Sequence, residues 1–233
     1  MIENIKAAQS RKNVIFWHTC QLGPWKEIVQ EQFDTLESSG ILDVCENVYI
    51  TFLGKKREDI SWLIEKHPKF ILFAYDPDLG NYERLCLMSL LEWSQENEAN
   101  VLYIHNKGAS RNNTENIRTW RKAMEYFLIE NYKTCLEDLK EYDALGCMIK
   151  NEGRRGHNIS NEAHKMHFSG NFWWSKTEYL KNLPSLNHID LRQNSAYWLC
   201  ERWVLHSHPN VKIKELYRGH GRDPYRVPLR GYK

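Results

Sequence analysis

The chain has 233 residues, enough for one large domain with a sizeable buried core. Its 32 lysines and arginines stand against 30 aspartates and glutamates, a formal charge of +2. This balance excludes a nucleic-acid binder driven by bulk positive charge and an acidic disordered tail. The compositional excess is aromatic, with nine tryptophans, twelve tyrosines, eight phenylalanines and also ten histidines. Such side chains suit a packed core or stacking on flat rings and sugar C–H faces.

The sequence carries no signal for a membrane or for secretion. It has no apolar run of about 18 residues, and its first segment, MIENIKAAQSRKN, lacks the apolar stretch of a secretory leader. The six cysteines are scattered without a C-x-x-C pair, which is typical of a reduced protein. We therefore expect a cytoplasmic protein without a transmembrane segment.

Short apolar runs alternate with amphipathic segments along the first 150 positions. The run NVIFW at 13–17 predicts a buried strand, and after Pro24 apolar residues recur at helical spacing until Gly40. The same reasoning predicts strands at 47–53, 69–75, 101–105 and 143–149, with helices at 57–66, 82–96 and 114–139. This alternation is typical of an α/β fold with a central sheet flanked by helices on both faces.

The last third of the chain is less regular. The polar segment 151–165 predicts an exposed loop, and 168–174 a sixth strand. Ser175 with Glu178 forms a capping box that opens a short helix. A further helix at 195–205 and an extended segment at 211–216 complete the predicted elements.

Ligands in such sheets bind beyond the carboxyl ends of the strands, which directs attention to 18–21, 76–78 and 105–108. The phosphate loops of NTPases and dehydrogenases and the nucleophile elbow of hydrolases are missing from the sequence. Lys107 and Gly108 directly follow the fourth predicted strand. A lysine at this position could bind a phosphate, and a glycine lets the backbone come close to a ligand. The plain alternative is a lysine on a turn without a function.

Three segments together resemble the GT-A glycosyltransferases. They are ERLCLMSLLEWSQENEANVLYIHNK at 83–107, HFSGNFWWSKTEYL at 167–180 and CERW at 200–203. The nearest resemblance is to the chlorella-virus capsid glycosyltransferases and to those of bacterial surface-polysaccharide loci, over about 13–208. It implies a single GT-A type domain over 1–233 with a Rossmann-like mixed sheet. Residues 1–150 would bind the nucleotide sugar, and 151–233 the acceptor.

The resemblance also implies an enzyme, a hexosyl or pentosyl transferase that uses a UDP-sugar. The acceptor would be an oligosaccharide or glycoprotein, and the location the host cytoplasm if the chain is viral. Glu201 would take the acceptor proton, and Lys107 would stabilise the leaving diphosphate. The donor would lie against His18, Thr19, Asp76, Asp78, His105, Asn106, Lys107 and Arg222. The acceptor would lie against Gly170, Asn171, Trp173 and Trp174, with one tryptophan in the pocket and the other in the core, because neighbours on a strand face opposite ways.

The family's Asp-x-Asp metal motif is replaced here by His105-Asn106-Lys107. The chain's one Asp-x-Asp, at Asp76 and Asp78, lies one strand early. Two versions stay open. In the first, these aspartates hold Mn²⁺ or Mg²⁺. In the second, His105 with a histidine such as His220 replaces them, or Lys107 and the basic tail stabilise the diphosphate without metal. The plain alternative for Asp-Pro-Asp is a turn.

The C-terminal segment 217–228, YRGHGRDPYRVP, could fold over the diphosphate as a lid that carries Arg218, Arg222 and Arg226. The main rival to the enzyme is a catalytically inactive, GT-A-like sugar- or nucleotide-binding module, which the missing metal motif favours. A metal-dependent hydrolase is a weaker third, because only two histidine pairs approach ligand spacing.

Overall fold

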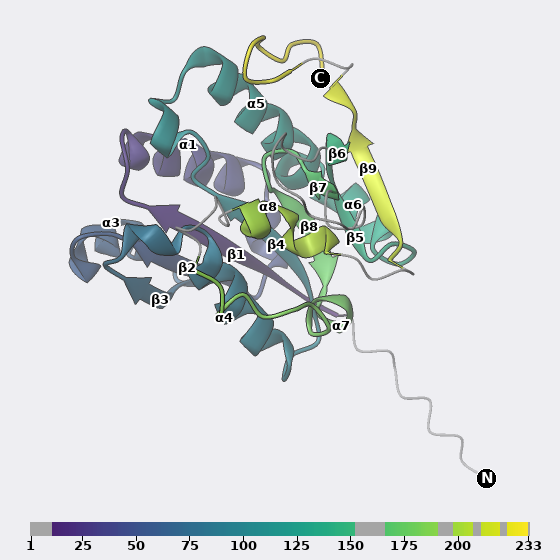
Figure 1. Cartoon of the computed structure of the whole chain (residues 1–233), viewed down its shortest axis with the longest axis horizontal. Helices are drawn as coiled ribbons and strands as arrows, with labels where there is room; N and C mark the ends of the chain where they lie inside the picture. Colours follow the sequence, from purple (N-terminus) through teal and green to yellow (C-terminus); the bar gives the residue numbers. More distant parts are fainter. Residues whose placement is uncertain (1–10, 152–165, 191–197, 207–210, 220–222, 233) are drawn as a thin grey trace.

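The computed structural model describes residues 11–151, 166–190, 198–206, 211–219 and 223–232. Their centre is a seven-stranded sheet of order β3-β2-β1-β4-β8-β5-β9 (Figure 1). Strands β1 to β4 run parallel, β8 is antiparallel to both neighbours, and β9 pairs parallel with β5. The expectation of a mixed α/β sheet flanked by helices is confirmed, and both predicted halves of the chain contribute strands to the same sheet.

The strands are short and apolar, as the sequence predicts. Those of the large sheet are β1 Lys12–Cys20, β2 Asn47–Leu53, β3 Phe70–Asp76, β4 Ala99–His105, β5 Ala144–Cys147, β8 Trp173–Lys176 and β9 Ile213–Tyr217. A separate antiparallel pair consists of β6 Ile149–Asn151 and β7 Met166–Phe168. The helices are α1 Trp25–Ser38, α2 Ile41–Val44, α3 Ser61–Ile64, α4 Arg84–Ser94, α5 Glu115–Glu125, α6 Tyr132–Asp138, α7 Thr177–Leu180 and α8 Trp198–Arg202.

Several predicted elements are divided. The long helix expected over 114–139 is interrupted by a π-helical turn at Tyr126–Glu130. The strand expected over 143–149 ends at Cys147, because Met148 has a φ of 52°. The strand expected over 168–174 is broken by Gly170 and Asn171, at φ 96° and 55°. Positive φ does not fit an extended strand, so these residues turn the chain.

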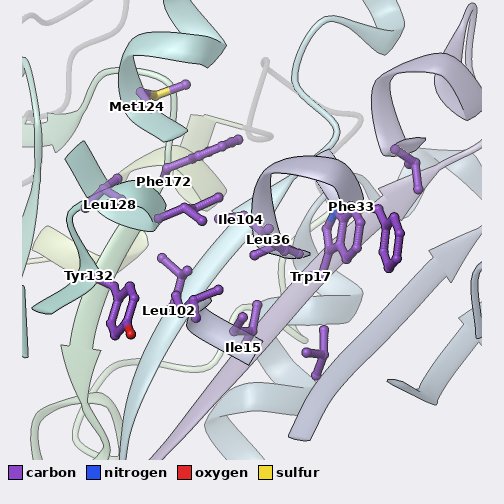
Figure 2. Close-up of a cluster of buried hydrophobic side chains, with 14 of the residues drawn as sticks. Ile15, Trp17, Phe33, Leu36, Leu102, Ile104, Met124, Leu128, Tyr132 and Phe172 are labelled. Atoms are coloured by element: carbon purple, nitrogen blue, oxygen red, sulfur yellow. The ribbon is translucent and has the colours of Figure 1, made fainter. Parts of the chain in front are cut away.

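Helices cover both faces of the sheet and form two cores. On one face α1, α5 and α6 pack on the odd-numbered side chains of β1 and the even-numbered ones of β4 (Figure 2). On the other face α4, α7 and α8 pack around side chains such as Phe16, Tyr103 and Trp173. Alternate strand residues point to opposite faces, and both faces are buried. This arrangement leaves the carboxyl ends of the parallel strands as the place where polar side chains meet.

Candidate functional site

A pocket lies at the carboxyl ends of β1 and β4. His18 and His105 are direct partners in the register of these two parallel strands, so their side chains leave the sheet on the same face. The pocket encloses about 230 Å³. It is lined by His18, Cys20, Leu22, Leu79, Tyr82, Glu83, His105, Asn106, Lys107, Gly108, Ala109, Ser110, Arg111, Ile117, Glu201 and Tyr225. Segments far apart in the sequence therefore meet at the edge where α/β sheets bind ligands.

The two histidines that line the pocket, His18 and His105, are neutral at neutral pH. His105 Nε2 lies 2.9 Å from the carbonyl oxygen of Gly170, an acceptor, so Nε2 carries the proton of the neutral ring. His18 Nδ1 lies 3.4 Å from the Thr51 hydroxyl. Burial lowers the pKa of His18 to about 4, and burial together with the nearby Lys107 ammonium lowers the pKa of His105 to about 3. At neutral pH these rings offer hydrogen bonds and no positive charge.

The depressed pKa values of His18 and His105 predict an acid-sensitive fold. An unfolded histidine titrates near 6.5, so the unfolded state binds more protons below that pH. The contribution of the two neutral histidines to the free energy of unfolding is therefore complete above pH 6.5. It is lost as the pH falls toward about 4 for His18 and about 3 for His105. Urea unfolding between pH 7 and 5 should show a loss of up to about 1.4 kcal/mol per pH unit for each histidine. A smaller slope is expected in His105→Gln, and equal stability at pH 7 and 5 would contradict the prediction.

Lys107 and Arg111 are the cations that line the pocket. Lys107 Nζ lies 4.1 Å from the centroid of the Trp120 ring, and the Arg111 guanidinium carbon lies 5.6 Å from that of Tyr225. Neither cation forms an ion pair with a carboxylate in the part of the chain that the structure describes. Two cations held by aromatic rings and lacking counter-ions are suited to an anionic group of a ligand.

The loop that carries Lys107 is held in place by hydrogen bonds from a buried arginine, Arg121. Arg121 Nη1 donates to the Lys107 carbonyl and to Asn113 Oδ1, both at 2.8 Å. Its guanidinium also pairs with Glu31 and lies 3.4 Å from Glu125. Gly108 has a φ of 107° and leaves room for this guanidinium, because a Cβ there would lie 3.3 Å from Arg121 Nη1. The backbone of the loop at Lys107 is therefore held by a buried arginine.

Glu83 and Glu201 are the carboxylates that line the pocket. Glu83 precedes α4, and its Oε2 accepts from the Tyr103 hydroxyl at 2.6 Å and from Asn171 Nδ2 at 2.5 Å. Glu201 lies on α8 and makes no hydrogen bond or ion pair with any described residue. The sequence singled out Glu201 and missed Glu83, because a glutamate at the start of a helix normally faces solvent.

An aromatic and aliphatic rim surrounds these charges. Leu22, Tyr82 and Tyr225 are among the few large apolar side chains exposed in the described residues, at 37%, 41% and 47%, and all three line this pocket. Tyr82 also has a φ of 47°, a strained conformation for a bulky residue. Exposed apolar groups gathered at one polar hollow are typical of a ligand site.

Two of the predicted donor-binding residues, Asn106 and Thr19, have structural contacts instead of a free side chain. Asn106 Oδ1 accepts from the Cys20 amide at 3.1 Å and Asn106 Nδ2 donates to the Cys20 carbonyl at 2.8 Å, which joins the ends of β1 and β4. Thr19 is fully buried and donates to the Thr51 carbonyl on the face opposite His18. Thr19 therefore cannot touch a nucleobase in this pocket.

The Asp-Pro-Asp segment is a turn at the sheet edge. Asp76 accepts from the Asp78 amide and from Asn81 Nδ2, and Asp78 accepts from the Gly80 amide. Asp76 ends β3, two strands from β1, and lines a different hollow of about 630 Å³ beside α4. Neither aspartate lines the Lys107 pocket, although Leu79 of the same turn does, and their predicted contact with the donor stays a prediction.

The residues predicted to bind a divalent metal do not form a metal site within the described ranges. No group of three or more His, Cys, Asp or Glu side chains gathers there in a way that could hold an ion. Asp76 and Asp78 are apart from His105, and the fourth predicted ligand, His220, lies outside the described residues. Arg222 likewise lies outside them. The requirement for Mn²⁺ or Mg²⁺ stays a prediction, and no step below passes through a metal.

The prediction that Gly170, Asn171, Trp173 and Trp174 contact the acceptor is wrong, because these residues are buried. Trp173 and Trp174 do face opposite ways, but each has 0% exposure, because β8 lies between β4 and β5 and both faces are covered. Trp174 Nε1 donates to the Leu128 carbonyl at 2.8 Å. Asn171 is 1% exposed. A Cβ on Gly170 would lie 2.5 Å from Met124 Sδ, so this glycine allows close packing and its carbonyl positions His105.

Part of the predicted lid reaches the pocket. Tyr225 lines it, packs edge-on against Trp120 at 4.8 Å between ring centroids, and is tied to α5 by the bond from Asn116 to its carbonyl. Arg218 and Arg226 pair instead with Glu215 and Asp223. The aromatic residue of this segment, rather than these two arginines, is placed to contact a ligand.

A larger hollow, of about 930 Å³, lies at the opposite, amino end of β1 and β4. Its cations are already paired with carboxylates: Arg11 with Glu178, Lys12 with Glu46, and Lys176 with Asp143. Lys107 and Arg111 of the smaller pocket have no such carboxylate partner among the described residues, and we take this pocket as the functional site. None of the helices in the described ranges combines the length and apolar character needed to cross a membrane.

A family described as "Domain of unknown function (DUF8361)" matches residues 13–222. No curated protein matches the chain. Among solved structures, the chain is similar to 4-diphosphocytidyl-2C-methyl-D-erythritol synthase from Anaerococcus prevotii DSM 20548, at 9% identity, 90% of each chain and a TM-score of 0.48. It is also similar to HddC from Yersinia pseudotuberculosis, at 11% identity, 89% of this chain, 91% of the other and a TM-score of 0.43. At TM-scores below 0.5 neither likeness says what this chain binds or does.

Proposed function

We propose that this chain, which belongs to the family described as a domain of unknown function (DUF8361), is a glycosyltransferase. It would move a sugar from a nucleoside diphosphate sugar, a UDP-sugar by the resemblance, to a hydroxyl of an oligosaccharide or glycoprotein acceptor. The observation that carries the proposal is the pocket itself. It combines two cations, Lys107 and Arg111, with a carboxylate, Glu201, and among the described residues none of the three has an ion-pair or hydrogen-bond partner for its charged group.

The two cations fit the leaving group. When the bond between the sugar's anomeric carbon and the diphosphate breaks, negative charge grows on the diphosphate oxygens. Lys107 and Arg111 would stabilise this charge, and the held backbone at Lys107 means that little reorganisation is needed at that moment. The neutral histidines of the pocket would donate or accept hydrogen bonds without opposing these cations.

The carboxylate fits the acceptor. Glu201 would accept the proton of the acceptor hydroxyl while the hydroxyl oxygen forms a bond to the anomeric carbon. The bond from that carbon to the diphosphate would break at the same time, and the diphosphate would leave with the bonding electron pair. The products would be the glycosylated acceptor, a protonated Glu201 and the nucleoside diphosphate. The pocket volume of about 230 Å³ lies below the roughly 300–1,000 Å³ usual for a whole ligand, so we place the sugar diphosphate inside it and the base at the tyrosine rim.

A binding module without catalysis is the second candidate. It is favoured by the lack, within the described ranges, of a side-chain group that could hold a divalent metal. Such a module would bind the donor and leave it intact. Release of free sugar from a bound UDP-sugar, or its transfer to an acceptor, would exclude this candidate.

Thermal unfolding of the wild-type chain with UDP, GDP and CMP, each with and without Mn²⁺, tests the proposal. A ligand that binds only the folded state raises the midpoint of unfolding. We expect UDP to raise it more than GDP or CMP. A chain that responds to none of the three, with or without Mn²⁺, is not a nucleotide-sugar enzyme.

A further inference from the structure

Glu83 is a pocket carboxylate to which the proposed mechanism gives no role. It is the residue before α4, a position where an acidic side chain usually accepts from the first free amides of the helix. Its side chain makes no such capping bond. It reaches into the pocket instead and lines it together with Lys107 and Glu201.

Two donors fix the orientation of this carboxylate. Glu83 Oε2 accepts from the Tyr103 hydroxyl at 2.6 Å and from Asn171 Nδ2 at 2.5 Å. Burial and the neighbouring Glu83 charge raise the pKa of Tyr103 well above its ordinary value, so the phenol keeps the proton that it donates. Both bonds end on the same oxygen. Glu83 Oε1 therefore has no donor among the described residues.

The two donors are themselves held by the core. Asn171 has a φ of 55° and is 1% exposed, and its Oδ1 accepts from Trp173 Nε1 at 2.9 Å. The Tyr103 ring stacks on the Trp173 ring, with 4.9 Å between centroids. The chain of hydrogen bonds from Trp173 through Asn171 to Glu83 connects the buried centre of the sheet to the pocket. Asn171 Nδ2 also lies 3.4 Å from the Cys200 carbonyl, next to Glu201.

We infer that Glu83 is a second carboxylate of the site, whose free oxygen, Oε1, accepts a hydrogen bond from a hydroxyl of the donor's sugar. The inference rests on the proposed function and deepens it. Glu83 and Glu201 would then have different roles: a carboxylate fixed by two donors orients the sugar, and an unbonded one takes the acceptor proton. A site built to bond a hydroxyl discriminates strongly against ligands that lack it, so Glu83 would select the sugar and not the nucleotide.

Titration calorimetry with UDP and with UDP-glucose, UDP-galactose, UDP-N-acetylglucosamine and UDP-xylose tests the inference. The quantity compared is the Kd of the tightest UDP-sugar divided by the Kd of UDP. We expect Glu83→Gln to raise this ratio about 10- to 100-fold, the effect of losing a hydrogen bond to a charged group. Tyr103→Phe keeps the charge of Glu83 but removes one of its donors, and it should raise the ratio less. Glu92→Gln, an exposed change on the same helix, should leave the ratio unchanged.

The outcomes separate the inference from the proposed function. A wild-type chain that binds no UDP overturns the proposed function and the inference with it. If UDP binds the wild type and the ratio in Glu83→Gln equals that of the wild type, the inference alone is wrong. Equal weakening of UDP and UDP-sugar in Glu83→Gln also overturns it, because a merely structural carboxylate would produce that pattern.

Discussion

Glu201→Gln is expected to lower the rate of sugar transfer by about 100- to 10,000-fold, the range that a positioned general base contributes. Glutamine has the shape of glutamate but does not accept the proton of the acceptor hydroxyl at neutral pH. The affinity for UDP should stay within about twofold, because in the proposed mechanism Lys107 and Arg111, and not Glu201, bind the diphosphate. Initial rates of sugar release or transfer from a UDP-sugar, with UDP titration beside them, measure both effects.

Glu137→Gln is the matched control for Glu201→Gln. Glu137 is an exposed glutamate, its side chain 70% accessible, that pairs with Lys140 on the surface. Such a pair contributes little to stability, and the variant should transfer sugar at the wild-type rate. If Glu201→Gln is as active as this control, Glu201 is not the base.

Arg121→Met is expected to lower the free energy of unfolding by about 3–5 kcal/mol, the usual effect of removing one partner of a buried ion pair. The Arg121 side chain has 0% exposure, and its loss leaves the buried Glu125 and the largely buried Glu31 with less compensation. It also removes the donor to the Lys107 carbonyl, so the loop of the pocket loses its support. Urea unfolding, followed by fluorescence of the buried tryptophans, measures the change.

Arg118→Met provides the control, because Arg118 pairs with the same Glu31 at 2.8 Å but is 55% exposed. We expect a loss below about 1 kcal/mol there. Burial raises the pKa of Glu125, so adding Glu125→Gln to Arg121→Met should restore part of the lost stability. If Arg121→Met and Arg118→Met lower the free energy of unfolding equally, the buried Arg121 ion pairs do not stabilise the fold more than the exposed pair does.

The alternation of apolar and amphipathic segments was sufficient to predict the central sheet. It also placed His18, His105 and Lys107 at the carboxyl ends of strands, since these residues directly follow apolar runs. Such patterns are local and depend on strand period and helix spacing. The breaks at Met148 and Asn171 were not predictable in this way, because non-glycine residues seldom adopt positive φ.

The errors at the site have a common origin in strand order. That Trp173 and Trp174 face opposite ways follows from the strand period, but whether each face is covered depends on β8 lying between β4 and β5. The position of Asp76 on the edge strand β3 also depends on strand order, and it places Asp76 in a different hollow beside α4. Glu83 and Tyr225 reach the pocket from distant parts of the chain, and no local pattern marks either one.

UDP titration into the wild type and Lys107→Ala tests most directly whether this pocket holds the nucleoside diphosphate. Lys133→Ala is the control, because Lys133 is also a lysine near an aromatic ring, 5.9 Å from the centroid of Tyr132, and lies outside the pocket. We expect Lys107→Ala to weaken UDP binding about 10- to 100-fold, as expected for loss of a charged hydrogen bond, and Lys133→Ala to bind like the wild type. Equal UDP affinity in Lys107→Ala and the wild type would contradict the placement of the donor in this pocket.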